Sequence, residues 1–98
     1  MLDANLRYMA LDQSKFTALI LLSAAEREGL EDAILEVLAP FSLTIEEKQK
    51  ISLRGRLILG ILISCDPAHV LAIEEDLLQF GSTQGVDVAI DYSETESH

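Results

Sequence analysis

The hydrophobic residues of the chain are gathered into six short segments separated by charged and turn-forming residues. Residues 16–22, FTALILL, are apolar at both odd and even positions, and turn-like or charged residues follow them. An apolar run of this length with such a boundary is typical of a strand that is buried on both faces. Residues 57–65 have the same character, so we predict a second buried strand there. Gly60 inside it is interpreted as a tolerated strand glycine, a position that often marks a close backbone approach.

Two segments have the spacing of amphipathic helices. The first is predicted to follow Gly29 and to end at Pro40, because proline cannot continue a helix. Its apolar stripe consists of Leu30, Ile34, Val37 and Leu38. Its acidic residues, expected to face water, are Glu31, Asp32 and Glu36.

The second helix is predicted to begin at Asp66, an N-cap acceptor that is followed by proline at the first helical position. Gly85 is expected to end it as the C′ glycine. Its predicted apolar stripe is Val70, Ile73, Leu77 and Leu78. Its predicted wet face is Glu74, Glu75 and Asp76.

Two further strands carry charge. In residues 43–53 we expect one face to bear Leu43, Ile45, Ile51 and Leu53, interrupted by Glu47 and Gln49, and the other to bear Glu46, Lys48 and Lys50. A half-buried strand of this kind belongs at the edge of a sheet. The LRGR sequence at 53–56 predicts a hairpin turn at Gly55. Residues 86–92 alternate between apolar and polar positions, as a strand with one dry face does.

The order of elements is therefore β-α-β-β-α-β, which predicts an α+β, ferredoxin-like fold with a four-stranded antiparallel sheet and two helices on one face. In that arrangement the first and third strands are central, and these are the two strands that are apolar on both faces. We expect residues 1–14 to be a poorly ordered lead-in, residues 15–93 to form the domain and residues 94–98 to be a polar tail.

The helices leave one face of such a sheet uncovered. Ile58 and Leu62 point away from the neighbouring apolar residues of their strand. We therefore predict that something apolar covers part of the second face, most simply a second copy of the domain.

Composition narrows the classes of partner. The chain has 98 residues, with 17 acidic and 7 basic side chains, and a formal net charge of −10. This balance argues against nucleic-acid binding and against an anionic membrane surface, which both require a basic footprint. The longest apolar stretch, 16–25, is about half the length of a membrane span. A single cysteine, Cys65, permits no internal disulfide, and we predict a cytoplasmic protein.

Catalytic and metal-binding patterns are missing from the sequence. Cys65, Asp66 and His69 lie close together, but a strand end, an N-cap and a solvated first-turn residue explain them better than a metal site. We find no nucleophile beside a base and no phosphate loop. We therefore predict no enzyme activity, no cofactor and no metal for this chain.

The stretch from Arg54 to Cys65, RGRLILGILISC, resembles the hairpin of the N-terminal ACT domain of bacterial phosphoserine phosphatases, of the actinobacterial type. The family pattern R-x-R-L-x-L-G-x-L-V is matched by Arg54, Arg56, Leu57, Leu59, Gly60 and Leu62. The resemblance covers roughly residues 17 to 93. It implies a regulatory module that binds a small amino acid, L-serine in the phosphatases, and reports to a fused or partner phosphatase domain. The D-x-D-x-T opening of the phosphatase domain does not occur in this chain.

The resemblance also implies where a ligand binds. The family's G-x-D-x-P-G loop corresponds to Ala24–Gly29, of which only the final glycine is retained. The candidate ligand-binding residues are Glu26, Arg27, Glu28, Gly29 and Leu30. Two hypotheses remain: an amino-acid-sensing domain that self-associates through its sheet or an edge strand, and a ligand-free structural dimerisation module whose amino-acid site has decayed.

Overall fold

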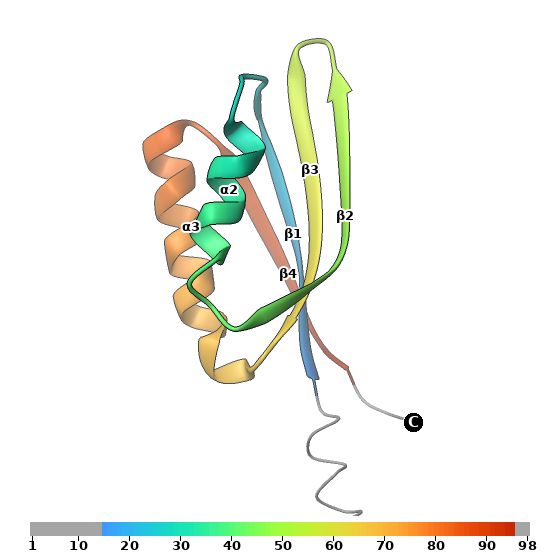
Figure 1. Cartoon of the computed structure of the whole chain (residues 1–98), viewed down its shortest axis with the longest axis vertical. Coiled ribbons are helices and arrows are strands. Elements are labelled where there is room, and N and C mark those ends of the chain that lie inside the picture. Colours follow the sequence, from blue (N-terminus) through green and yellow to red (C-terminus); the bar gives the residue numbers. More distant parts are fainter. Residues whose placement is uncertain (1–14, 96–98) are drawn as a thin grey trace, which may run out of the picture.

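The computed structural model describes residues 15–95 and shows one four-stranded sheet with two α-helices (Figure 1). In chain order the elements are β1 (Lys15–Ala25), α2 (Leu30–Leu38), β2 (Leu43–Leu53), β3 (Arg56–Cys65), a single 3₁₀ turn (Pro67–His69), α3 (Val70–Gln84) and β4 (Asp87–Thr95). All neighbouring strands are antiparallel, in the spatial order β2-β3-β1-β4. The predicted ferredoxin-like order, with the first and third strands at the centre, is confirmed. The lead-in predicted for residues 1–14 lies outside the described residues.

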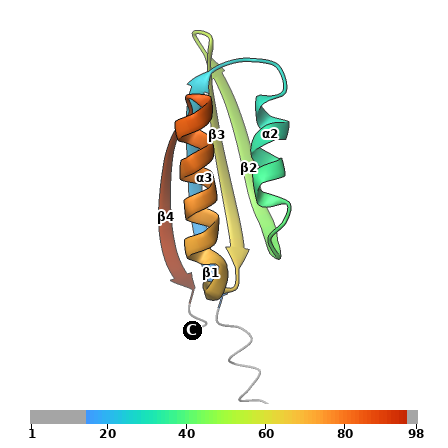
Figure 2. The same ribbon diagram turned by 90° about the vertical axis from the view of Figure 1, so that its left-hand side faces the viewer.

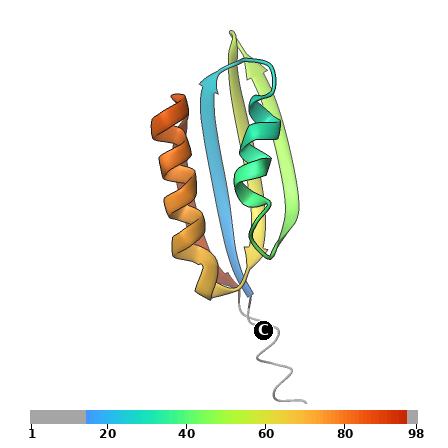
Figure 3. The same ribbon diagram turned by 60° about the vertical axis from the view of Figure 1, so that its left-hand side comes forward.

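Both helices pack on the same face of the sheet, so the domain has two layers (Figure 2). Helix α2 lies towards the β2 side and α3 towards the β4 side. Figure 3 shows α2 in front of the sheet and the two helices side by side along the strands. Within residues 15–95 the opposite face of the sheet carries no helix, and we call it the open face. As expected, one side of the sheet is covered and the other is not.

The hydrophobic core lies between the sheet and the helices. The central strands contribute alternate residues to it: in β1 these run from Ala18 to Ala24 and in β3 from Leu57 to Ile63. The fully buried large side chains are Ile20, Leu22, Ile34, Leu38, Leu59, Ile61, Ile63 and Leu77. Because the central strands pair in register, with Ile20 opposite Ile61, their core-facing residues lie side by side.

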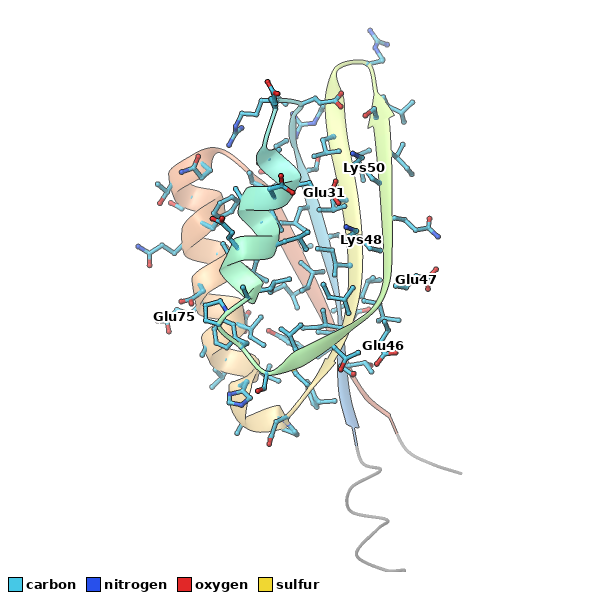
Figure 4. The ribbon with its side chains drawn as sticks, in the orientation of Figure 1. Glu31, Glu46, Glu47, Lys48, Lys50 and Glu75 are labelled. Carbon is cyan, nitrogen blue, oxygen red and sulfur yellow. The ribbon has the colours of Figure 1, made fainter. Side chains whose placement is uncertain are left out.

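The β2 strand departs from its predicted face. A β-bulge between Ile45 and Glu47 adds one residue, Glu46, to β2, so that Ile45 pairs with Ile63 but Glu47 pairs with Leu62. An extra residue moves all later side chains to the other face, because the side-chain period of a strand is two. Ile51 and Leu53 therefore lie on the open face, and not with Leu43 as predicted. In agreement, Glu47 and Lys48 point to opposite sides of β2 (Figure 4).

The outer limits of β1 and β4 extend beyond the predictions. Strand β1 continues to Ala25, since Ser23, Ala24 and Ala25 go on pairing with β3. Strand β4 begins at Asp87 and continues through Thr95. It thus passes residue 93, where we had expected the domain to end and a polar tail to start. Pairing with the early part of β1, as in Lys15 opposite Thr95, extends the strand into this polar sequence.

Helix α3 buries Ile73 and Leu77 of its predicted stripe but not Leu78. Its buried residues are Ile73, Leu77 and Gly81, spaced four apart. Leu78, expected in the stripe, is 47% exposed. The reason is that α3 approaches the sheet along the line of Gly81, which leaves Leu78 on the flank of the helix.

The start of α3 follows its predicted cap with one change. Asp66 is the N-cap of the 3₁₀ turn, and its Oδ1 accepts a hydrogen bond from the Ala68 amide at 2.9 Å. The helix proper begins one turn later, at Val70. His69 is half-buried, and its ring lies 6.5 Å from that of Phe41, so it is not the solvated residue we expected. Gly85 ends the helix in the left-handed conformation, as predicted.

The close backbone approach predicted at Gly60 occurs at another glycine. A methyl group at Gly60 would meet Leu21 Cδ2 at an ordinary 3.6 Å. At Gly81 it would overlap the carbonyl oxygen of Val86 and lie 2.9 Å from Val88 Cγ2. The missing side chain of Gly81 is therefore what allows α3 to lie against the start of β4.

The described helices are short. None of those in residues 15–95 is long and apolar enough to cross a membrane.

Candidate functional site

The loop between β1 and α2 is held in place by a contact with the hairpin turn that joins β2 and β3. The Glu26 amide donates a hydrogen bond to the Gly55 carbonyl oxygen at 2.9 Å. Gly29 takes a φ of 81°, a conformation that few other residues adopt, and leads directly into Leu30 at the start of α2. No side chain caps this end of the helix. The Leu30 amide donates to the Arg27 carbonyl oxygen at 3.3 Å, so the amides of Glu31 and Asp32, which follow it in the first turn, are the ones that can receive an anionic group.

A groove of about 360 Å³ lies at this end of the molecule. It is lined by Glu26, Arg27, Glu28, Gly29, Leu30, Glu31, Asp32, Lys50 and Leu57. The five residues predicted to bind a ligand are all in its wall. Their assignment as a binding site stays a prediction, but the fold brings them together around one hollow.

Two of these side chains are engaged by neighbouring elements. The Ser52 hydroxyl donates to Glu26 Oε2 at 2.9 Å, which links the loop to β2. Arg27 Nη2 donates to the backbone oxygen of Gln84 at 3.2 Å and to its side-chain Oε1 at 3.3 Å. This bond ties the loop to the last residue of α3. The guanidinium thus lies at a helix C-terminus, where a positive charge is favourable.

Glu31 is bound by two lysines of β2. Its Oε2 lies 2.6 Å from Lys48 Nζ, and its Oε1 lies 3.2 Å from Lys50 Nζ. Figure 4 shows the carboxylate on α2 and the two ammonium groups on β2 pointing towards one another. Hydrogen bonds from Lys48 and then Lys50 lower the pKa of Glu31 below its ordinary value of 4.5. The predicted water-facing Glu31 is therefore an ion-paired residue that joins α2 to the sheet.

The charges of the groove are mixed, with an excess of acid. Its lining has four carboxylates and two cationic side chains, those of Arg27 and Lys50. Such an arrangement can hold a small molecule that carries both a negative and a positive group, with the helix amides as additional donors. Among residues 15–95, no group of three or more His, Cys, Asp and Glu side chains is placed to hold a metal ion.

A second polar cluster lies on the open face. Arg56 donates from Nε and Nη2 to the Ser23 hydroxyl at 3.2 and 3.0 Å, and its Nη2 lies 3.5 Å from Asp87 Oδ2. These three residues come from β3, β1 and β4, so the cluster crosses the sheet. It connects three strands of the sheet.

A very small apolar cavity, of about 10 Å³, lies between the sheet and α3 beside Tyr92 and Cys65. The Tyr92 hydroxyl is buried and has no hydrogen-bond partner among the described residues. Burial, with the nearby Glu74 carboxylate adding its negative charge, raises the pKa of Tyr92 to about 12. Burial followed by the charge of Asp66 raises the pKa of the Cys65 thiol. A thiol held in its neutral form is a poor nucleophile, so this pair offers no reactive group.

Comparison with protein families decides the class of the domain. The model of the ACT domain family matches residues 16–91 of the chain. The chain belongs to the ACT domain family. ACT domains are a regulatory fold, and the predicted resemblance is confirmed at this level.

Individual relatives agree with this assignment. Phosphoserine phosphatase SerB2 of Mycobacterium tuberculosis is 34% identical over 83 residues, which cover 83% of this chain and 20% of that protein. The chain thus spans about a fifth of the length of this curated relative. The predicted resemblance to the regulatory part of a phosphoserine phosphatase is therefore supported by sequence identity as well as by the hairpin pattern.

Solved structures share the fold at lower identity. A protein assigned as a glycine cleavage system transcriptional repressor superposes with a TM-score of 0.78 at 15% identity, over 86% of this chain and 49% of that one. An ACT domain protein from Streptococcus pneumoniae superposes with a TM-score of 0.69 at 18% identity, over 79% of this chain and 89% of that one. At these identities the likeness describes the fold alone.

The groove contains residues that the sequence did not single out. Besides the five predicted residues, its lining includes four that were not assigned to a ligand site: Glu31, Asp32, Lys50 and Leu57. Lys50 was predicted to lie opposite the apolar face of β2, and the sequence alone could not relate it to a loop more than twenty positions away. Only the alternation of lysines at 48 and 50 hinted at a shared, charged side of that strand.

Proposed function

We propose that this ACT domain senses a small amino acid in the groove between the 26–29 loop, the start of α2 and β2, and regulates a phosphatase of the phosphoserine type. The observation that supports it best is the groove itself. Its lining includes all five of Glu26, Arg27, Glu28, Gly29 and Leu30 beside the uncapped start of a helix. The identity with a phosphoserine phosphatase favours L-serine as the ligand.

Binding would be coupled to the rest of the domain through the contacts of the loop. Glu26 is bonded to β2 and Arg27 to the end of α3, so a ligand that shifts the loop acts on both elements. A regulatory domain requires such a link between its ligand and its outer surface. The regulated phosphatase is proposed as a separate or fused catalytic unit in the cytoplasm.

Isothermal titration of the chain with L-serine, glycine and L-alanine tests the ligand. We expect saturable heat for at least one of them and a matching rise in the thermal midpoint, because a ligand that binds only the folded state stabilises it. Absence of heat and of any thermal shift at millimolar ligand would rule the proposal out.

The open face supports a second candidate, a dimerisation module that needs no ligand. Its large apolar side chains are exposed to a degree unusual for a packed sheet: Leu19 by 37%, Leu21 by 44%, Ile51 by 49% and Leu53 by 57%. A second copy of the domain would remove this surface from water. The loss of the family's glycine and proline at Ala24 and Glu28 favours the same reading.

Sedimentation velocity separates the two candidates. A dimer that forms equally with and without amino acids, together with silent titrations, would support the module. A monomer at all concentrations would exclude self-association but leave amino-acid sensing standing.

A further inference from the structure

Lys50 is the cationic group of the groove that is free to change partner. We propose that the Lys50 ammonium binds the carboxylate of the ligand. Until the ligand binds, Lys50 is paired with the Glu31 carboxylate, which the ligand then displaces. The inference rests on the proposed amino-acid-sensing function and adds a recognition residue and an internal competitor to it.

Two lysines of β2 lie in nearly the same place but differ in how they contact Glu31. Lys48 and Lys50 are two residues apart on β2, on the helix side of the sheet, opposite Ile61 and Leu59. Both contact the Glu31 carboxylate, Lys48 at 2.6 Å and Lys50 at 3.2 Å. The Lys48 side chain is 36% exposed and that of Lys50 is 53% exposed. Lys48 thus holds Glu31 more closely, and Lys50 is the more accessible of the two.

The two lysines also differ in their position relative to the groove. Lys50 lines it and Lys48 does not. An incoming carboxylate can therefore replace Glu31 Oε1 on Lys50 while Glu31 Oε2 stays paired with Lys48. The exchange leaves no carboxylate without a cationic partner, so it replaces one charge-assisted bond by another of the same kind.

The other cation of the lining is less available. Arg27 donates from Nη2 to two oxygens of Gln84, one of the backbone and one of the side chain. A ligand that used Nη2 would have to displace these bonds, and the other N–H groups of the guanidinium are held in the direction that the bonds to Gln84 impose. Lys50, in contrast, would lose only its contact with Glu31 Oε1, while Glu31 Oε2 remains paired with Lys48.

The remaining charges of the groove specify the class of ligand. Glu28 and Asp32 lie in the lining with no cationic partner among the described residues, and Glu26 accepts only a hydroxyl. These acids favour an ammonium group on the same ligand and repel a second negative charge. The site therefore suits a zwitterionic α-amino acid with a small neutral side chain, and it disfavours O-phospho-L-serine and L-aspartate.

Titration of three variants with L-serine tests the assignment. We expect Lys50→Met to weaken binding by about ten-fold or more, the effect of losing one hydrogen bond between charged groups. Lys48→Met is the matched comparison: it keeps the Lys50 ammonium in the groove but makes Lys50 the only lysine paired with Glu31, so we expect a loss of no more than about five-fold, the value of one exposed ion pair. Glu31→Gln removes the competitor and should tighten binding, a gain that a merely structural role for Glu31 would not produce. Circular dichroism and the thermal midpoint check that each variant is folded.

A ligand without a carboxylate completes the test. L-serinamide should bind wild type and Lys50→Met equally weakly, because neither protein can make the contact with it. Equal affinity of wild type and Lys50→Met for L-serine would overturn the inference and leave the proposed function intact. Weaker binding by Glu31→Gln would overturn the role of Glu31 as competitor. If glycine, L-alanine and L-serine all fail to bind wild type, the proposed function is overturned and the inference with it.

Discussion

At the scale of single residues, Glu31 makes the stability of the domain depend on pH. Its pKa is lowered in the folded state by Lys48 and Lys50, while in the unfolded chain it keeps its ordinary value near 4.5. Where the two pKa values differ, the unfolded state binds more protons, so the free energy of unfolding rises with pH in that window. The contribution of Glu31 is complete above pH 4.5 and is lost as the pH falls through the lowered pKa.

Urea unfolding of wild type and Glu31→Gln at several pH values measures this contribution. We expect wild type to have the higher midpoint at neutral pH and the two midpoints to converge as the solution becomes acidic below pH 4.5. Glu36→Gln, an exposed change on the same helix, is the control and should show no such convergence. A midpoint difference between wild type and Glu31→Gln that is constant with pH would contradict the ion-pair explanation.

The candidate site was partly predictable at this scale. The family pattern pointed to residues 26–30, because they follow one another in the chain and match a loop by position. Lys50 could not be assigned to the same hollow, since its contact with the start of α2 depends on how helix and sheet pack. The contact of the Arg27 guanidinium with Gln84 could not be predicted either, since the two residues are 57 positions apart.

At the scale of elements, Gly81 sets the distance between α3 and β4. Replacing a helical glycine by alanine normally stabilises a helix by up to about 1 kcal/mol. Here the added methyl group would overlap the Val86 carbonyl oxygen, and Val86 also donates its amide to the Gly81 oxygen at 2.9 Å. We therefore expect Gly81→Ala to destabilise the domain by about 1–3 kcal/mol in urea unfolding, as overpacking does.

A neighbouring substitution provides the control for Gly81. Ser82 is exposed on the same turn of α3, so Ser82→Ala should follow ordinary helix propensity and raise stability slightly. If Gly81→Ala stabilised the protein as Ser82→Ala does, the close approach of α3 and β4 would be refuted.

The β-bulge in β2 is a second feature at the scale of elements, and Glu46 is its extra residue. Deleting Glu46 leaves Ile45 opposite Ile63 and Glu47 opposite Leu62, so every remaining pair of β2 and β3 is preserved. The deletion removes the hydrogen bond from the Ser64 hydroxyl to Glu46 Oε2. We expect a folded protein that loses about 1 kcal/mol of stability, the value of one hydrogen bond.

Deletion of Lys48 is the matched comparison, since it also shortens β2 by one residue. To keep the hairpin register, Glu47 would take the place of Lys48 and lie beside Glu31. Two carboxylates would then replace an ion pair, so this variant should unfold at clearly lower urea than the Glu46 deletion. Equal stabilities would show that the position of the extra residue does not matter.

The limits of the elements show what periodicity can predict. Both helices and all four strands were identified, because apolar spacing reflects burial along each segment. The bulge was missed, since Ile51 and Leu53 alternate with Leu43 in sequence whether or not one residue is extra. The stripe of α3 was misassigned at Leu78 because glycine has no side chain to signal that position 81 is buried.

At the scale of the whole molecule, the open face is the surface through which we propose that the domain associates. Leu21 lies in its middle, opposite Gly60 on β3 and Ala89 on β4. If two copies pack through this face, Leu21→Lys places an ammonium group within the interface, where it is costly to bury. We expect this variant to sediment as a monomer under conditions in which wild type is a dimer, with little change in its own unfolding midpoint because the position is 44% exposed.

Leu71→Lys makes the same substitution on α3, on the helix side of the sheet. Leu71 is 76% exposed, and its replacement should leave the association of wild type unchanged. A monomer in both variants would point to a general effect of charge, and a dimer in both would place the contact at an edge strand.

The sequence by itself determined the family, the order of the elements and the central position of β1 and β3. Each of these depends on local spacing: apolar on both faces for a central strand, four-residue steps for a helix, and the RLILG pattern for the family. Tertiary packing decided the rest. Because β2 contains one extra residue, Ile51 and Leu53 lie on the open face. Helix α3 contacts the start of β4 at Gly81, where a side chain would not fit. Lys50 lies against the start of α2. These features depend on residues far apart in the chain, whose distances arise only when the sheet and helices have packed.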